Sequence, residues 1–169
     1  GLEVRLRHLP DCSDAEVAAA SAIVIGASIR YGHHKPEVAA FIARHRAVLD
    51  ARPNALFSVN VVARKPGKDV PEGNPYLQKF LRGIAWKPQR LAVFAGRIDY
   101  PSLGMADRTM IRFIMWMTKG PTDPTRAFEF TDWAYSKSAF REFGQRRLEY
   151  LFSPAAGWRG PPELVEIDL

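Results

Sequence analysis

Cysteine and long hydrophobic segments are both scarce in this sequence. Cys12 is the single cysteine among 169 residues, so a disulfide scaffold is excluded and a zinc site built on cysteines would lack ligands. One cysteine is typical of proteins from a reducing compartment. The longest segment without a charged side chain, Val17–Ile29, has 13 residues, whereas a membrane-spanning helix needs about 20. The sequence therefore predicts no membrane span.

Several short motifs of nucleotide and hydrolase chemistry are also missing. The chain contains no G-x-G-x-x-G, no G-x-x-x-x-G-K-[ST] and no G-x-S-x-G, which leaves Rossmann, P-loop and nucleophile-elbow chemistry unsupported. His33 and His34 are adjacent, so their side chains point apart, and no other histidine or cysteine lies at ligand spacing. We expect no metal site.

Positive charge is in excess. The net charge is +6 and the isoelectric point is about 9.7, which favours an anionic partner such as nucleic acid, an acidic membrane surface or a polyanionic small molecule. A basic surface that serves only solubility is an equally good reading. A nucleic-acid surface needs aromatic and basic residues interleaved along one face, whereas the basic residues singled out below gather at loop ends. We therefore expect no nucleic-acid partner.

Short apolar segments alternate with helical patterns along the chain, which predicts a single α/β domain with a mostly parallel sheet over residues 1–169. The predicted strands are Leu2–Leu9, Ser21–Ala27, Asn54–Val62, Arg90–Gly96 and Phe128–Thr131. The predicted helices begin at Pro36 (with Val38, Phe41, Ile42, His45 and Leu49 at helical spacing), cover Asn74–Gly83 and Met105–Lys119, and start again at Asp132. Residues 101–126 interrupt the alternation as an inserted segment, and residues 154–169 form a loose tail.

Three loops directly follow predicted buried strands: Ala27–His34, Asn60–Pro66 and Gly96–Pro101. Ligands of open α/β sheets bind at the carboxyl ends of the strands, so these loops predict one binding edge. They contribute four cations, two tyrosines and two hydrogen-bonding side chains: Arg30, Arg64, Lys65, Arg97, Tyr31, Tyr100, Ser28 and Asn60. This set suits a flat, anionic aromatic ligand. Taken singly, each of these residues also has an ordinary structural explanation.

The segment Met105–Lys119 carries apolar residues on two sides of its predicted helix. Met110, Phe113, Ile114 and Met117 make one stripe, which core packing explains most simply. Ile111, Met115 and Trp116 lie on the side that also carries Arg108 and Arg112, as in a helix lying in a membrane interface. We therefore expect Ile111, Met115 and Trp116 to face a membrane; the alternative is a helix buried on most sides.

Five strings carry a family resemblance: VIGASIRYGHH (24–34), FSVNVVARKP (57–66), FAGRIDYP (94–101), DRTMIRFIMWM (107–117) and FTDW (130–133). With them the chain, over residues 1–143, resembles the flavodoxin-like, menaquinone-dependent protoporphyrinogen oxidases of bacteria. The resemblance implies a three-layer flavodoxin-like sandwich with a five-stranded parallel sheet, order 2-1-3-4-5, and FMN as cofactor. The implied reaction is the six-electron oxidation of protoporphyrinogen IX to protoporphyrin IX in haem synthesis, with electrons passed to menaquinone or ubiquinone.

The same resemblance implies site residues and a location. The flavin would contact Ser28, Ile29, Arg30, Tyr31, Gly32, His33, Ser58, Val59, Asn60, Val61, Ala63, Arg64, Gly96, Arg97 and Tyr100. Tyr31 would stack on the ring, and Arg30, Arg64 or Lys65 would meet the propionates of the substrate. His33 or His34 could relay protons. The protein would lie peripherally on the cytoplasmic face of the inner membrane. Another flavoprotein, such as an NAD(P)H:quinone reductase or an electron-carrying flavodoxin, is the alternative function.

Flavodoxin-like proteins hold the FMN phosphate in a serine- and threonine-rich turn after the first strand. No such turn occurs in this sequence, and Gly1 has the character of a helix end. We expect the missing strand, turn and helix to precede Gly1, over roughly thirty residues if they form one βα unit. A protein that has lost its cofactor is the competing explanation.

Overall fold

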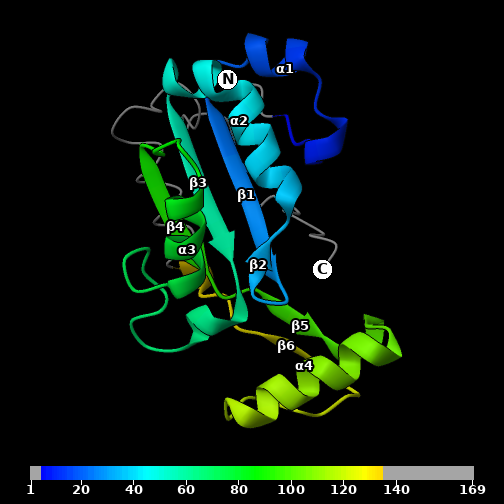
Figure 1. Cartoon of the computed structure of the whole chain (residues 1–169). Coiled ribbons are helices and arrows are strands. Elements are labelled where there is room, and N and C mark those ends of the chain that lie inside the picture. Colours follow the sequence, from blue (N-terminus) through cyan, green and yellow to red (C-terminus); the bar gives the residue numbers. More distant parts are fainter. Residues whose placement is uncertain (1–4, 135–169) are drawn as a thin grey trace.

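A parallel sheet forms the centre of the molecule in the computed structural model, which describes residues 5–134. Strands β1 (Ile23–Arg30), β3 (Asn54–Val59) and β4 (Arg90–Phe94) are parallel neighbours, and the two-residue strand β2 (His33–His34) folds back antiparallel on β1. The sheet order is β2-β1-β3-β4 (Figure 1). The three predicted parallel strands are confirmed, while the main sheet of the described residues has four strands, with a short hairpin at its edge, and not the expected five.

The parallel strands end at the same level, which decides where a ligand can bind. Ser28 lies opposite Val59, and Val59 lies opposite Phe94. The three loops that follow β1, β3 and β4 therefore leave the sheet side by side. This is the edge at which open α/β sheets bind their ligands.

Helices α2 (Pro36–Asp50) and α3 (Pro75–Gly83) cover one face of the sheet (Figure 1). Each begins with a proline in its first turn, where the missing N–H costs no hydrogen bond, and the Asn74 side chain accepts a hydrogen bond from the backbone N–H of Leu77 at 3.1 Å. The core between these layers contains Ile25, Ala27, Val38, Ile42, Leu49, Leu56, Leu77, Trp86 and Val93. The predicted helix starting at Pro36 is confirmed, with Val38, Ile42, His45 and Leu49 buried.

The chain before β1 differs from the prediction. Residues 5–8 form no strand, Leu9–Asp11 is the 3-10 helix η1, and α1 (Asp14–Ala19) follows with a capping box between Ser13 and Glu16. The strand predicted at Leu2–Leu9 is therefore wrong over its described part. The alternating pattern misled the prediction. Leu6 is exposed, and residues 5–9 pair with no strand of either sheet.

A second, smaller unit lies beyond the carboxyl ends of the parallel strands (Figure 1). Strands β5 (Arg97–Asp99) and β6 (Ala127–Glu129) pair antiparallel, and between them run the 3-10 helix η3 (Tyr100–Ser102) and helix α4 (Met105–Met117). Ile98, Tyr100 and Met115 form its own buried cluster. The strand predicted at Phe128–Thr131 is confirmed in β6, but as part of this ribbon and not of the main sheet.

The far end of the chain is described only up to residue 134. The backbone N–H of Ala134 donates to the Asp132 carboxylate at 2.9 Å, as expected for a helix that begins after Asp132. The rest of that predicted helix, the tail at 154–169 and residues 1–4 lie outside the described residues. Among the described helices, none has the length and apolar character needed to cross a bilayer.

Candidate functional site

The three predicted loops meet at the carboxyl edge of the sheet. The backbone N–H of Asn60, directly after β3, donates to the Phe94 carbonyl at the end of β4, at 2.9 Å. Gly96 turns the chain from β4 into β5 with φ of 74°, a conformation that glycine adopts without a steric cost. The structure thus brings together the loops that the sequence singled out, although it uses their side chains in different ways.

Four of the predicted side chains are exposed at this edge: Arg30, Tyr31, His33 and Arg97. Tyr31 is 54% exposed and has φ of 50°, an uncommon backbone conformation for a tyrosine. Gly32, with φ of 80°, completes the turn into β2. Arg97 forms an ion pair with Asp99 at 2.6 Å. An exposed aromatic ring flanked by cations is the part of the prediction that this edge retains.

Arg30 and Tyr31 together hold the carboxylate of Asp107 in the first turn of α4. The Arg30 guanidinium donates to Oδ2 of Asp107 at 2.7 Å, and the Tyr31 hydroxyl donates to Oδ1. The hydrogen bond from Tyr31, with the positive charge of Arg30, lowers the pKa of Asp107, so the carboxylate is ionised at neutral pH. The sequence reasoning missed Asp107; its only signal is that it is the one acid within Met105–Met117.

Arg64 is occupied at the other end of α4. Its guanidinium donates to the Thr118 hydroxyl at 2.7 Å, to the Thr118 carbonyl at 3.2 Å and to the Val61 carbonyl at 3.0 Å. Burial lowers the pKa of Arg64, which still remains charged. The expected role of Arg64 in binding flavin and propionate does not match this geometry, because both terminal guanidinium nitrogens already donate to Val61 and to Thr118 at the end of α4. Lys65 makes no side-chain hydrogen bond or ion pair within residues 5–134.

A chain of buried polar side chains runs beneath the same edge. His34 Nε2 lies 3.0 Å from the Ser58 hydroxyl, the Asn60 amide donates to that hydroxyl at 3.3 Å, and the Asn74 amide donates to Asn60 Oδ1 at 3.1 Å. Burial lowers the pKa of His34 to about 4, so its ring is neutral at physiological pH. The side chains of Ser58 and Asn60, both predicted to contact flavin, are buried and connect β2 and β3 to the start of α3.

Other predicted contacts lie inside the protein. Tyr100 is completely buried, and its hydroxyl donates to the Pro121 carbonyl at 2.8 Å. Ala63 is also buried. The expectation that Tyr100 lines a flavin pocket therefore does not hold for its side chain, because Tyr100 packs beneath α4. The remaining predicted contacts are partly buried at the strand ends: Ser28, Ile29, Val59, Val61 and Gly96.

The outward face of α4 differs from the one predicted. Met115 is 2% exposed and packs with Tyr100 and Ile98, so its predicted membrane-facing role is wrong; Ile111 is partly buried against the same cluster. Trp116 is 70% exposed, as expected. The stripe expected in the core is instead exposed: Met110, Phe113, Ile114 and Met117. The helix turns this way because Arg108 donates to the carbonyls of Tyr100, Pro101 and Leu103.

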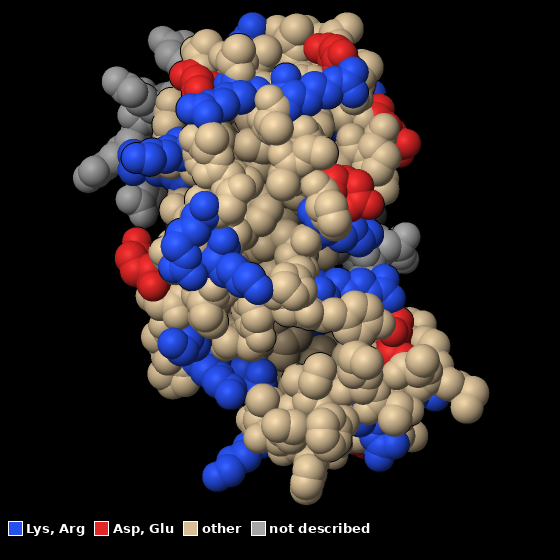
Figure 2. Space-filling view, viewed as in Figure 1, with Lys and Arg blue, Asp and Glu red and all other residues tan. Residues whose placement is uncertain are grey.

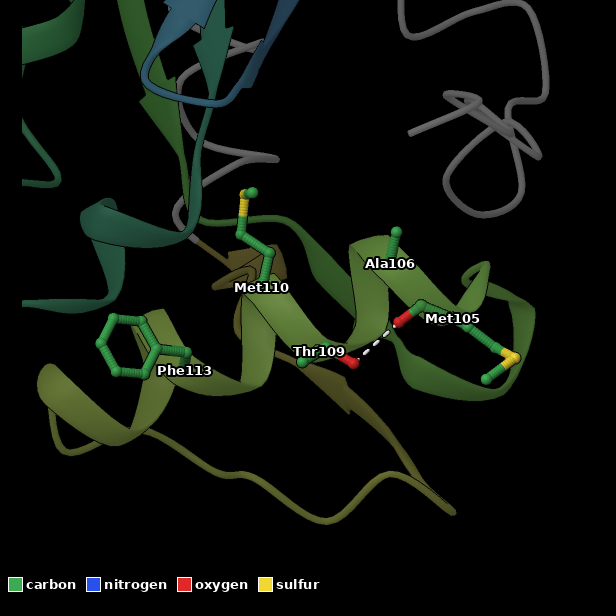
Figure 3. Close-up of a pocket in the computed structure, with 5 residues that line it drawn as sticks. All are labelled: Met105, Ala106, Thr109, Met110 and Phe113. Carbon is green, nitrogen blue, oxygen red and sulfur yellow. Dashed lines mark hydrogen bonds between the residues drawn. The ribbon is translucent and has the colours of Figure 1, made fainter.

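The exposed apolar face of α4 borders a hollow. Figure 2 shows an uncharged surface over α4, with lysine and arginine side chains on either side and a recess between α4 and the strand ends. A shallow, open groove of about 650 Å³ lies on α4 alone and is lined by Met105, Ala106, Thr109, Met110 and Phe113. In Figure 3, Ala106 and Met110 rise from α4 toward the side of the strand ends. This edge thus combines an exposed tyrosine, cations and an apolar wall.

Metal chemistry has no support at this edge. Within residues 5–134 there is no group of three or more histidine, cysteine, aspartate or glutamate side chains placed to hold a metal ion.

Comparisons with known proteins agree with this architecture. The family model described as "Flavodoxin domain" matches residues 2–125. The chain is 45% identical over 120 residues to protoporphyrinogen IX dehydrogenase [quinone] of Escherichia coli K12, covering 71% of this chain and 66% of that protein. It is 41% identical over 141 residues to the protein of the same name from Leishmania major, covering 83% of this chain and 61% of the relative.

The chain thus spans about two thirds of the length of these relatives. No solved structure matches it. The match of the family model over most of the chain agrees with the parallel α/β sheet and with the loops that converge at its carboxyl edge. The chain belongs to the flavodoxin domain family.

Proposed function

We propose that this protein is a flavin-dependent oxidoreductase that oxidises protoporphyrinogen IX to protoporphyrin IX in haem synthesis and passes the electrons to a quinone. The observation that carries the proposal is the convergence of the three strand-end loops, with Tyr31 and Arg30 exposed beside an apolar groove. The two relatives named as protoporphyrinogen IX dehydrogenase [quinone] support the choice of substrate and acceptor.

The described residues suit the ring portion of FMN. Tyr31 offers an exposed aromatic face at the strand ends, and the Arg30 guanidinium lies 5.5 Å from the centre of that ring, so a flat, electron-poor ring has both a stacking surface and a cation beside it. Tyr31, Gly32 and Arg97 are the residues that would hold it. The flavin, when bound, supplies the two-electron chemistry that links substrate to acceptor. The protein's own side chains orient the two partners and neutralise their charge.

An acidic tetrapyrrole needs cations near an apolar surface. Arg30 pairs with Asp107, which is partly solvent-exposed, whereas both terminal nitrogens of Arg64 already donate to Val61 and Thr118. We therefore assign propionate binding to Arg30, with Lys65 as a second cation, and remove Arg64 from the set. The neutral ring of His34 hydrogen-bonds Ser58 below the surface, so His33, which is exposed, is the better candidate to exchange protons with solvent.

We also propose that the protein works at the cytoplasmic surface of the membrane, whose bilayer dissolves the quinone. The support is the uncharged outer side of α4, where Met110, Phe113, Trp116 and Met117 are all exposed. Apolar side chains of this kind lie in the interface between headgroups and acyl chains when cations stand beside them. Lysine and arginine side chains border the uncharged surface over α4 (Figure 2).

A reconstitution experiment tests the proposed reaction. The purified chain is incubated with FMN and, under anaerobic conditions, with protoporphyrinogen IX and either menaquinone or ubiquinone. We expect the visible absorption band of protein-bound oxidised flavin, and formation of fluorescent protoporphyrin IX that depends on the quinone. Reduction of the quinone by NADPH without the tetrapyrrole would instead show an NAD(P)H:quinone reductase. A protein that takes up no FMN, tested beside a longer relative that does, would contradict flavin dependence of this chain.

A vesicle experiment tests the membrane proposal separately. Sedimentation with vesicles containing anionic phospholipid is compared for the natural protein and the double variant M110S/F113S. We expect at least a tenfold loss of vesicle binding, because two exposed apolar side chains no longer enter the interface. Equal binding of the variant would refute docking through α4.

A further inference from the structure

The turn after β1 forms a two-pronged grip on a carboxylate. Arg30 and Tyr31 are consecutive residues, yet both reach Asp107, 77 and 76 residues further along the chain, and each binds a different oxygen. The first turn of a helix favours an acid through the helix dipole. That preference explains an acid in this turn of α4, but it does not require a cation and a hydroxyl from another loop. We therefore treat Arg30 and Tyr31, which we call the grip, as a pair of donors that could bind any carboxylate placed between them.

Asp107 is held in a way that leaves it exchangeable. The Arg30 side chain is 44% exposed and that of Asp107 is 26% exposed, and ion pairs with this access to water add little to stability. A second carboxylate arriving from solvent can therefore compete for the same donors. Arg30 and Tyr31 donate to the two oxygens of one carboxylate, so their donors are spaced for a group of that size.

Helix α4 does not depend on Asp107 for its place. Met115 anchors it in the cluster with Ile98 and Tyr100, Arg108 ties it to three backbone carbonyls, and Arg64 binds its last turn at Thr118. The grip can consequently release Asp107 while the helix remains docked. If Asp107 served only to attach the helix, these other attachments would not be needed.

An apolar surface lies directly beside the grip. Asp107 and Met110 are three residues apart on α4 and so are neighbours on the helix surface, and Ala106, adjacent to Asp107, lines the same groove of about 650 Å³ (Figure 3). A ligand with an apolar body and a carboxylate could rest its body on Ala106 and Met110 while its acid replaces that of Asp107. The two donors alone would accept any carboxylate, and the apolar surface alone any apolar group. Side by side, they favour a ligand that has both.

We propose that Arg30 and Tyr31 form a binding site for the carboxylate of a flat apolar acid, and that Asp107 fills this site when no ligand is bound. The inference deepens the proposed function, on which its choice of a tetrapyrrole with propionates rests. Asp107 then acts as a built-in competitor: it lowers the affinity for the acid and keeps the grip arranged for a carboxylate. No covalent step is involved.

Binding titrations with matched acid and neutral probes test this site. Protoporphyrin IX is compared with its dimethyl ester, and pyrenebutyrate with pyrenebutanol, each followed by probe fluorescence on the same chain. For D107N, which removes the competing charge but keeps the size, we expect both acids to bind about threefold to fivefold more tightly, in line with the strength of exposed ion pairs. The two neutral probes should be unaffected. R30M should weaken both acids about tenfold or more, because a charge-assisted hydrogen bond is lost.

A matched control comes from the neighbouring loop. Asp99 pairs with Arg97 at 2.6 Å in a comparable exposed ion pair, so D99N removes the same charge from the same end of the molecule without touching the grip. D99N should leave acid binding within twofold of the natural protein, and the urea midpoint of each variant shows that it is folded. Equal gains in D99N and D107N would overturn the proposal, because the effect would then be one of net charge.

The remaining outcomes separate this site from the proposed function. If pyrenebutyrate follows the expected pattern and protoporphyrin IX does not bind, the carboxylate site stands and the tetrapyrrole assignment fails. If protoporphyrin IX and its ester bind equally, with no response to D107N, the site is overturned while the reaction can still hold. Weaker acid binding in D107N would show that Asp107 supports the ligand instead of competing with it, and would also overturn the proposal.

Discussion

Replacing Arg64 with methionine should weaken the attachment of α4 before it affects any substrate. The variant keeps most of the aliphatic stem but loses the hydrogen bonds to the Thr118 hydroxyl, at 2.7 Å, and to the carbonyls of Thr118 and Val61, at 3.2 and 3.0 Å. Hydrogen bonds from a charged donor contribute about 1.5–3 kcal/mol where they are well buried. Here the guanidinium is partly exposed, so water replaces some of the loss.

A second effect opposes the first. Burial lowers the pKa of Arg64, which means that the folded protein carries a desolvation penalty that methionine removes. Setting this gain against the lost hydrogen bonds, we expect the free energy of unfolding to fall by about 1–2 kcal/mol. Equilibrium unfolding in urea measures this change, and hydrogen exchange of the α4 amides shows whether the loss is local.

The neighbouring cation provides the control. Lys65 makes no side-chain hydrogen bond or ion pair in the described part of the chain, so K65M should change the free energy of unfolding by less than about 0.5 kcal/mol. If Arg64 were instead a substrate ligand, R64M would leave stability and flavin binding unchanged and raise KM for the tetrapyrrole. That result would refute the structural role argued here.

Three further predictions concern folding. N74A should cost about 2–3 kcal/mol in urea unfolding, because Asn74 caps α3 and also donates to Asn60; a loss below about 1 kcal/mol would contradict this. M115A should cost about 2–4 kcal/mol, whereas M110A on the exposed face should cost almost nothing, and equal thermal shifts would show that α4 is oriented differently. Because the folded pKa of His34, about 4, lies below its ordinary value of 6.5, the unfolded chain takes up the proton first. Stability should therefore fall by about 2 kcal/mol as pH decreases from 6.5 to 4, and H34Q should flatten this dependence.

The sequence predicted the sheet and its helices because burial imposes strong periodic patterns on them. Continuous apolar segments became β1, β3 and β4, and the spacing from Val38 to Leu49 became the buried face of α2. The face of α4 could not be derived in the same way, because both of its sides carry large apolar residues. Which side of α4 faces inward depends on Arg108, whose hydrogen bonds to the carbonyls of Tyr100, Pro101 and Leu103 fix the rotation of the helix.

The sequence predicted where the site lies, but it could not predict which side chains there are available to bind a ligand. Loops after parallel strands must converge, and they do so here. Whether a particular cation is available depends on partners that are distant in the sequence: Arg30 meets Asp107, and Arg64 meets Thr118 54 residues away. No local pattern contains that information. The buried bond between His34 and Ser58 is likewise visible only after β2 has folded back on β1.

The β5–β6 ribbon and α4 form a much smaller unit than the main sheet, and we expect this unit to open at a lower free energy than the sheet does. The ribbon has three residue pairs and three fully enclosed side chains, far less than the sheet beneath α2 and α3. Such a unit opens sub-globally, at a fraction of the free energy of complete unfolding. Because α4 forms one wall of the candidate site, the ligand-facing part of the molecule can rearrange while the β1–β3–β4 scaffold stays intact.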